Sequence, residues 1–210
     1  MGARLFTAVV PPREVVVELD MLLDPRRDAD SSLRWTRPDG WHVTTSFMAS
    51  ADRYRLETLE ECLAEVAART APFPLGLAGG VTFPDPMRAR VLALAVGIGH
   101  EALAALAASA RTAAARAGVE VDGARYVGHL TLARHNRGVA AKRWLEVLSS
   151  FPVWEWTADE LVLIESRQIG RHYDVVERFP LVGGYSWKRR NPTSDAPLID
   201  GLNTSPHARG

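Results

Sequence analysis

The chain has 210 residues, of which 47% are hydrophobic, so it can bury a substantial core as one domain or as two small lobes. Its 25 lysines and arginines balance its 25 aspartates and glutamates, which gives a formal net charge of zero. This balance argues against a protein that coats long stretches of nucleic acid by neutralising phosphates.

Cys62 is the only cysteine, which excludes an intramolecular disulfide and any cysteine-rich zinc module. A single thiol fits a reducing compartment. The first residues lack the apolar core of a signal peptide, and no segment approaches about 18 uninterrupted apolar residues. We therefore expect a cytoplasmic protein without a membrane segment.

The first half of the chain predicts a strand, a helix, a second strand, a second helix and an extended segment. The first strand covers residues 4–10 and ends at Pro11-Pro12, and the first helix ends near Leu23. Asp52 is the expected N-cap of the second helix. One apolar stripe recurs along that helix at three- and four-residue steps, at Leu56, Leu59, Leu63 and Val66. Residues 73–83 are expected to be extended.

The second half repeats this order of elements. It predicts strands over 90–96, 128–134 and 160–164, helices over 100–117 and 139–149, and a last strand that begins at Tyr173. Such a pseudo-repeat places two lobes about a local two-fold axis with a groove between them. The fold class is therefore α+β, with antiparallel sheets that line a central cleft and helices outside.

Residues 1–182 are expected to form this domain, and residues 183–210 a tail. The tail is rich in Gly, Ser, Pro, Asn, Lys and Arg and has few apolar residues. Its Lys188-Arg189-Arg190 segment could contact a polyanion, but a flexible, solvated end is the simpler interpretation.

Two segments with the pattern H-x-T-x carry the clearest functional signal. They are His42-Val43-Thr44-Thr45 and His129-Leu130-Thr131-Leu132, and both lie in β-prone stretches. Because side chains alternate along a strand, each segment presents an imidazole and a hydroxyl on one face. Two such strands beside one groove would surround one position with two proton-transfer groups and two neutral donors. This arrangement suits a phosphodiester.

With both segments in place, the chain resembles the 2H phosphoesterase superfamily, specifically the bacterial RNA 2',3'-cyclic phosphodiesterases, also called 2'-5' RNA ligases. The resemblance covers nearly all of residues 1–182. Its other marks are Arg4 to Val9, Leu33 to Pro38, Pro86 to Leu92, His129 to Arg134, Leu163 to Arg167, Tyr173 and Phe179-Pro180-Leu181.

The resemblance implies a monomeric, metal-independent and cofactor-free enzyme that opens a terminal 2',3'-cyclic phosphate to a 2'-phosphate, with 2'-5' RNA ligation as a possible side activity. His42 would be the proton donor and His129 the proton acceptor. Thr44 and Thr131 would bind the phosphate oxygens. An enzyme that acts on an RNA end needs no excess of positive charge.

Two positions depart from the simplest picture. Arg134 would bind substrate as it does in the family, yet strict alternation sends it to the face opposite His129, so it reaches the cleft only if the strand bends or ends at Ala133. Thr45 stands where the family often has an aliphatic residue. Because Thr45 lies opposite His42, we expect altered packing rather than altered chemistry.

Other assignments remain open. Phe6, Trp35 and Tyr173 could stack on a base, although aromatic residues in strands are more often part of the core. His100, His135, His172 and His207 lack the motif and are expected at the surface. The substrate could instead be a small nucleotide, such as ADP-ribose cyclic phosphate or 2'-5' oligoadenylate, or the protein could be a non-catalytic RNA-end binding module. A metal hydrolase fits poorly, because the chain has no H-E-x-x-H motif.

Overall fold

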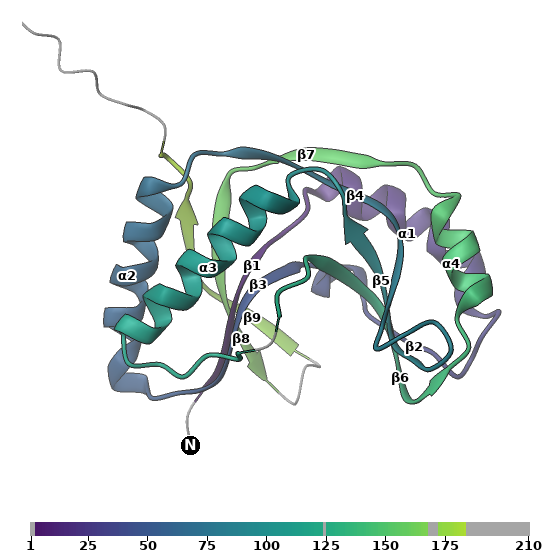
Figure 1. Cartoon of the computed structure of the whole chain (residues 1–210), viewed down its shortest axis with the longest axis horizontal. Coiled ribbons are helices and arrows are strands. Elements are labelled where there is room, and N and C mark those ends of the chain that lie inside the picture. The colour runs from purple at the N-terminus through teal and green to yellow at the C-terminus, as the bar shows by residue number, and fades with distance from the viewer. Residues whose placement is uncertain (1–2, 124, 168–171, 184–210) are drawn as a thin grey trace, which may run out of the picture.

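The computed structural model describes residues 3–123, 125–167 and 172–183 (Figure 1). The strands of this part of the chain are β1 (Ala3–Val9), β2 (Arg34–Trp35), β3 (Val43–Ala51), β4 (Phe73–Phe83), β5 (Ala89–Val96), β6 (His129–Val139), β7 (Trp154–Ala158), β8 (Glu160–Arg167) and β9 (His172–Pro180). The helices are α1 (Arg13–Arg27), α2 (Leu56–Arg69), α3 (His100–Arg116) and α4 (Lys142–Ser149), with 3₁₀ turns η1 (Pro38–Gly40) and η2 (Arg53–Arg55).

All nine strands join one sheet in the order β7-β4-β5-β6-β3-β1-β8-β9, and β2 pairs with β6 beside β3. Every pairing is antiparallel. The sheet has two halves of four main strands, which meet where β3 pairs with β6 through Val43 and Leu130. The two predicted lobes are therefore the two halves of one curved sheet.

The two sequence repeats exchange elements between these halves. β4 closes the first repeat but pairs with β5 of the second, and β8 closes the second repeat but pairs with β1 of the first. The helices follow the same rule, since α2 packs with α3 on one half while α1 and α4 lie over the other (Figure 1). Both halves thus contain elements from both repeats.

The hydrophobic core lies between the sheet and the helices. The stripe predicted for α2 is confirmed, because Leu59, Leu63 and Val66 are buried there. Val43 and Leu130 are fully buried and point into this core. The opposite face of β3 and β6 is therefore left for the histidines and threonines.

Several element boundaries differ from the prediction. α1 continues to Arg27 with Pro25 in its last turn, where the Arg26 guanidinium donates a hydrogen bond to the Leu22 carbonyl oxygen. Asp52 does not cap α2, because it precedes η2 and makes no side-chain cap. β6 extends to Val139 and so delays the start of α4.

The sequence prediction did not include β2 and β7, which are short strands that hydrogen bonding to longer neighbours stabilises. The predicted tail and its Lys188-Arg189-Arg190 segment lie outside the described residues, apart from Gly183. The backbone N–H of Gly183 donates to the Thr70 carbonyl oxygen at the end of α2.

Candidate active site

The two H-x-T segments lie against each other in opposite directions. Val43 pairs with Leu130, and this antiparallel register brings His42 across from Thr131 and Thr44 across from His129. Opposed residues of an antiparallel pair point to the same face, so all four side chains share the face that does not carry the buried Val43 and Leu130. The expected convergence of two imidazoles and two hydroxyls is therefore present at the centre of the sheet.

A β-bulge follows the threonine in each segment. Thr7 pairs with Ser46 and Ala8 with Thr44, which leaves Thr45 as the extra residue of β3. Leu92 pairs with Ala133 and Ala93 with Thr131, which leaves Leu132 as the extra residue of β6. Each extra residue shifts the alternation by one position.

The bulge in β6 decides the position of Arg134. Leu132 and Ala133 are both fully buried, and Arg134 returns to the exposed face and lines the cleft with His42 and Thr44. The bulge in β3 acts in the same way, because Thr45 and Ser46 are buried and Phe47 reaches the cleft. Phe47 and Arg134, each five residues after the histidine of its segment, are thus both presented to the cleft.

Both imidazoles are held by the same kind of hydrogen bond. The Nδ1 atom of His42 lies 2.7 Å from the Gly40 carbonyl oxygen, and the Nδ1 atom of His129 lies 2.8 Å from the Val127 carbonyl oxygen. Since a carbonyl oxygen only accepts, Nδ1 carries a proton in each ring. This fixes the tautomer and leaves Nε2 of each histidine to exchange a proton with a ligand.

The surroundings of the two histidines disfavour their charged forms. Burial is the main cause that lowers the pKa of His42 from 6.5 to about 4; the nearby charges of Arg134 and His129 also lower it, and the hydrogen bond to the Gly40 carbonyl oxygen opposes the shift. Burial also lowers the pKa of His129, with Arg134 again contributing. The rings and Arg134 therefore form one electrostatic unit that would favour an anion between them.

Aromatic rings pack on both imidazoles. The ring centroid of Phe6 lies 4.6 Å from that of His42, and Tyr173 meets His42 edge-on at 5.3 Å. On the other side, Phe83 lies 4.7 Å from His129. These contacts contribute to the burial of the two imidazoles.

The cleft beside His42 has a volume of about 970 Å³. Its walls come from η1, β1, β2, β3, β6 and the β8–β9 pair, and its lining residues are Arg4, Phe6, Arg34, Trp35, Thr36, Arg37, Asp39, Gly40, His42, Thr44, Phe47, Arg134, Ser166, His172 and Tyr173. Arg4, Arg34, Arg37 and Arg134 outnumber the single acid in this set. A chain with no net charge thus concentrates positive charge at one place.

Thr45 packs against Thr7. Its hydroxyl lies 2.7 Å from that of Thr7, and both residues are buried behind the site. An aliphatic residue at position 45 would leave the Thr7 hydroxyl without this partner.

Three aromatic candidates have mixed roles. Phe6 is buried, yet it contacts His42 and lines the cleft, as Tyr173 does. Trp35 also lines the cleft and packs edge-on against Trp144 at 5.1 Å.

The remaining histidines divide as follows. His100 is exposed at the start of α3, as predicted. His172 lies at the cleft rim, where its Nε2 is 3.0 Å from an Asp174 carboxylate oxygen. The prediction for His135 was wrong in part, because its Nδ1 is buried. His207 lies outside the described residues.

Arg4, Arg34 and Phe47 were not singled out from the sequence. Phe47 could have been found by aligning the two segments, because it stands where Arg134 stands in the second. Arg34 carries no such signal, since its place in the cleft depends on the pairing of β2 with β6.

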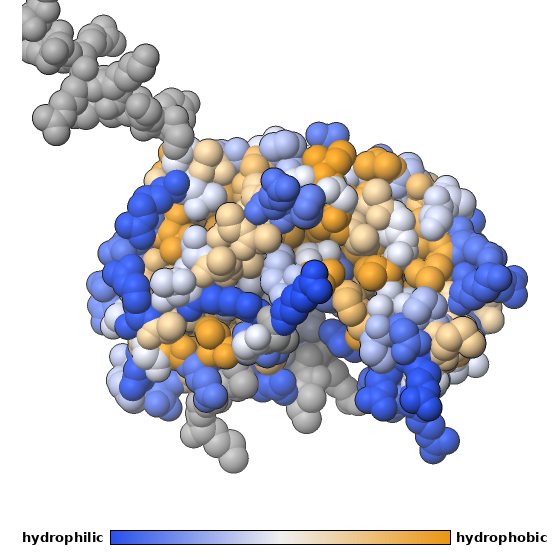
Figure 2. Space-filling model, viewed as in Figure 1, coloured by the Kyte–Doolittle hydropathy of each residue, from blue (hydrophilic) through white to orange (hydrophobic). Residues whose placement is uncertain are grey.

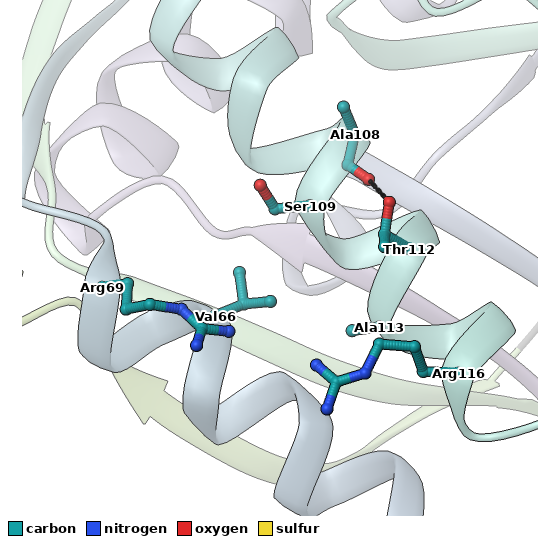
Figure 3. Close-up of a pocket in the computed structure, with 7 residues that line it drawn as sticks. All are labelled: Val66, Arg69, Ala108, Ser109, Thr112, Ala113 and Arg116. Atoms are coloured by element: carbon teal, nitrogen blue, oxygen red, sulfur yellow. Dashed lines mark hydrogen bonds between the residues drawn. The ribbon is translucent and has the colours of Figure 1, made fainter.

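A second hollow of about 270 Å³ lies between α2 and α3, and it lacks the features of an active site (Figure 3). Arg69 and Arg116 border it, but both pair with Glu65, at 3.5 and 3.1 Å. Thr112 donates to the Ala108 carbonyl oxygen of its own helix. These groups are already partnered, so the cleft at His42 is the candidate site.

Within the described ranges, no group of three or more His, Cys, Asp or Glu residues could hold a metal ion. Across the same residues, no helix has both the length and the apolar character needed to span a membrane.

Comparison with known proteins identifies the family. Residues 25–169 match the family model of the 2'-5' RNA ligase superfamily. The RNA 2',3'-cyclic phosphodiesterase of Geobacillus stearothermophilus is 31% identical over 163 residues, which cover 74% of this chain and 51% of that protein. The protein of the same name from Aquifex aeolicus is 30% identical over 156 residues, covering 71% of this chain and 82% of its own length. The chain thus spans about half the length of the Geobacillus relative.

The fold also matches a solved structure. The crystal structure of E. coli LigT complexed with 3'-AMP superposes with a TM-score of 0.67, at 23% identity, over 86% of this chain and 99% of that one. At this identity the match concerns the fold alone. The chain belongs to the 2'-5' RNA ligase superfamily.

Proposed function

We propose that the protein hydrolyses the 2',3'-cyclic phosphate at the end of an RNA strand and leaves a 2'-phosphate. The observation that carries this proposal is the opposed register of the two H-x-T segments, which gathers two imidazoles and two hydroxyls on one face. The relatives from Geobacillus and Aquifex, both named RNA 2',3'-cyclic phosphodiesterases, support the same substrate.

Opening the cyclic ester requires two proton transfers. One neutral imidazole takes a proton from water as the water oxygen bonds to phosphorus. The bond between phosphorus and O3' breaks, and the other imidazole, in its protonated form, gives its proton to O3'. The products are a 2'-phosphate and a 3'-hydroxyl, and no further reactant is needed. Histidine suits both steps because its ordinary pKa lies near neutrality.

Thr44 and Thr131 donate their hydroxyl protons to the non-bridging oxygens, on which charge accumulates in the transition state. Arg134 adds a positive charge beside the same phosphate, a position that the β6 bulge allows. These residues and the two histidines account for charge and proton movement without a metal ion or an organic cofactor.

We assign His42 as the proton donor and His129 as the acceptor. A pKa of about 4 keeps His42 neutral near pH 7 in the protein without substrate. Its role as a donor therefore requires that the bound phosphate anion raise this pKa. His129 must stay neutral in the same complex to accept the proton of water.

The direct test is to present an oligoribonucleotide with a 2',3'-cyclic end and to identify the terminal phosphate that forms. A 2'-phosphate is expected. His42→Ala or His129→Ala should each lower turnover by about 10²–10⁴-fold, and Thr44→Val or Thr131→Val should cost less. Near-normal turnover in either histidine variant, with folding verified by circular dichroism, would reject the shared site.

Leaving-group chemistry separates the two roles. A sugar alkoxide departs badly without a proton, whereas nitrophenolate departs readily. On a nucleotide nitrophenyl ester, His42→Ala should recover much of its lost rate, and His129→Ala should stay slow because water must still be activated. Recovery in the His129 variant instead would reverse the assignment.

A small nucleotide is the second candidate substrate, because the similar LigT fold was crystallised with 3'-AMP. ADP-ribose cyclic phosphate and 2'-5' oligoadenylate belong to this class. The same pair of histidines would also ligate two RNA ends if a ribose 5'-hydroxyl replaced the attacking water. Parallel assays on these substrates rank the activities.

We further propose that the enzyme acts as a cytoplasmic monomer, in keeping with the free, buried Cys62. Size-exclusion chromatography tests the oligomeric state, and cell fractionation tests the location.

A further inference from the structure

Two arginines face each other across neighbouring strands on the wall of the cleft. β2 has only two residues, and it pairs antiparallel with β6 so that Arg34 lies opposite Arg134 and Trp35 opposite Ala133. Residues opposed in this way have side chains on the same face and Cα atoms about 4.5–5.5 Å apart. Like charges in such a pair repel each other. An anion bound between the two guanidinium groups would remove that repulsion.

Neither arginine has an acidic partner in the part of the chain that the structure describes. Within the described ranges, no carboxylate lies within ion-pair distance of Arg34 or Arg134, and both side chains are exposed. Arg37 provides the contrast, because it lines the same cleft but has an Asp39 carboxylate oxygen 3.4 Å from its Nε. Arg37 is thus paired with an acid in this wall, whereas Arg34 and Arg134 are not.

The arginine pair lies beyond the reacting groups along β6. Leu132 and Ala133 separate Thr131 from Arg134, but Leu132 is the extra residue of the bulge, so Thr131 and Arg134 are two steps of the β-ladder apart, or about 7 Å. This is comparable with the distance between neighbouring phosphates of a nucleotide chain. Arg134 can therefore contact the reacting phosphate on one side and a neighbouring phosphate on the other, and Arg34, opposite Arg134, is placed to contact the neighbouring one.

Positive charge continues past the pair. Arg90 precedes Val91, which pairs with Arg134, and Arg88 and Arg137 are exposed near the same end of the sheet. Figure 2 shows strongly hydrophilic side chains at this end of the molecule, where Figure 1 places β2 and β6. A strand that leaves the cleft in this direction would keep its phosphates near cations.

We propose that Arg34 and Arg134 form a subsite for the phosphate that joins the terminal nucleotide to its neighbour. This inference rests on the proposed function and narrows its substrate class to nucleotides that carry a 5'-phosphate, and so to oligonucleotides rather than free nucleoside cyclic phosphates. Arg34 is the residue that distinguishes these substrates, because Arg134 lies between the two phosphates and can contact both.

The test compares three substrates, namely adenosine 2',3'-cyclic phosphate, the same compound with a 5'-phosphate, and a dinucleotide with a 2',3'-cyclic end. The native protein should prefer the second and third. Arg34→Gln should lower kcat/KM for these two by about tenfold or more, as expected for a lost charge-assisted hydrogen bond, and leave the first nearly unchanged. Arg53→Gln, at an exposed arginine outside the cleft lining, is the matched control and should change none of the three by a comparable factor. Arg34→Lys should retain part of the preference, because it retains the charge.

Equal native rates on all three substrates would overturn the proposal, and so would an equal loss on all three in Arg34→Gln. If the native protein cleaves none of them, the proposed hydrolysis fails but the subsite is still tested by binding. In a titration, the 5'-phosphorylated compound should bind the native protein more tightly than the unphosphorylated one. Arg34→Gln should abolish this difference and reduce the slope of log affinity against log salt by about one. An unchanged difference would exclude the subsite.

Discussion

Protonation of His42 should destabilise the fold in a calculable way. Burial, with Arg134 and His129 contributing, lowers its pKa from 6.5 to about 4. The unfolded chain therefore binds this proton at a higher pH than the folded protein does. Well above pH 6.5 the ring is neutral in both states. As the pH falls from 6.5 towards 4, the unfolded chain takes up the proton before the folded protein does, so the free energy of unfolding decreases. The full effect is about 3 kcal/mol, of which about 2 kcal/mol is lost between roughly pH 7.5 and pH 5.

The assay is urea unfolding at these two pH values for the native protein and for His42→Asn. An asparagine amide can donate to the Gly40 carbonyl oxygen as Nδ1 does, but it does not titrate. Groups that titrate in both proteins, including His129, largely cancel in the comparison. The native protein should therefore lose about 2 kcal/mol more than the variant on acidification. Equal losses would show that His42 is not held in its neutral form, and the electrostatic account of the site would be refuted.

Three further predictions concern packing, metal dependence and the arginine pair. Thr45→Val should lower the free energy of unfolding by about 1–3 kcal/mol in chemical denaturation, because it leaves the buried Thr7 hydroxyl without its partner. The double variant Thr7→Val with Thr45→Val should be nearly as stable as the native protein, and a double variant as unstable as the single one would contradict this. Exhaustive chelation should leave hydrolysis unchanged, and a large loss restored by one divalent ion would reject the two-histidine mechanism. Arg34→Gln should raise the melting temperature in low salt, because it relieves about 0.2–1 kcal/mol of repulsion between the two arginines. Inorganic phosphate should reduce the difference in melting temperature between the variant and the native protein. A variant less stable than the native protein would contradict the repulsion.

The shared face of the four H-x-T side chains could be predicted from the sequence because their pattern is local. An H-x-T triplet in a strand fixes which side chains share a face, and this requires only the two-residue period of the strand. The buried Val43 and Leu130 between the paired residues confirm that reasoning. The helices with clear apolar periodicity were predicted for the same reason, as α2 illustrates.

What could not be predicted depends on pairing between distant strands. The position of Arg134 turns on whether β6 contains a bulge, and the bulge exists only relative to the register of β5. Arg34 enters the cleft because two residues far from β6 in sequence add a short strand to it. The exchange of β4 and β8 between the repeats is also invisible locally, because a strand's own pattern does not name its partner.

The two bulges also explain how a duplicated site can accept a directional substrate. The opposed H-x-T segments are nearly equivalent by a local two-fold relation, so by themselves they would bind a cyclic phosphate in either of two orientations. At the equivalent position beyond each bulge, however, β3 presents Phe47 and β6 presents Arg134. Arg4 lies over the Phe47 ring at 5.7 Å, on a surface suited to stacking, whereas Arg134 faces Arg34 and attracts anions. A nucleotide has both a flat base and a phosphate, and it can satisfy both ends in one orientation only. We therefore propose that the residues in which the two repeats have diverged orient the substrate in this cleft, and that the residues they share carry out the proposed proton transfer.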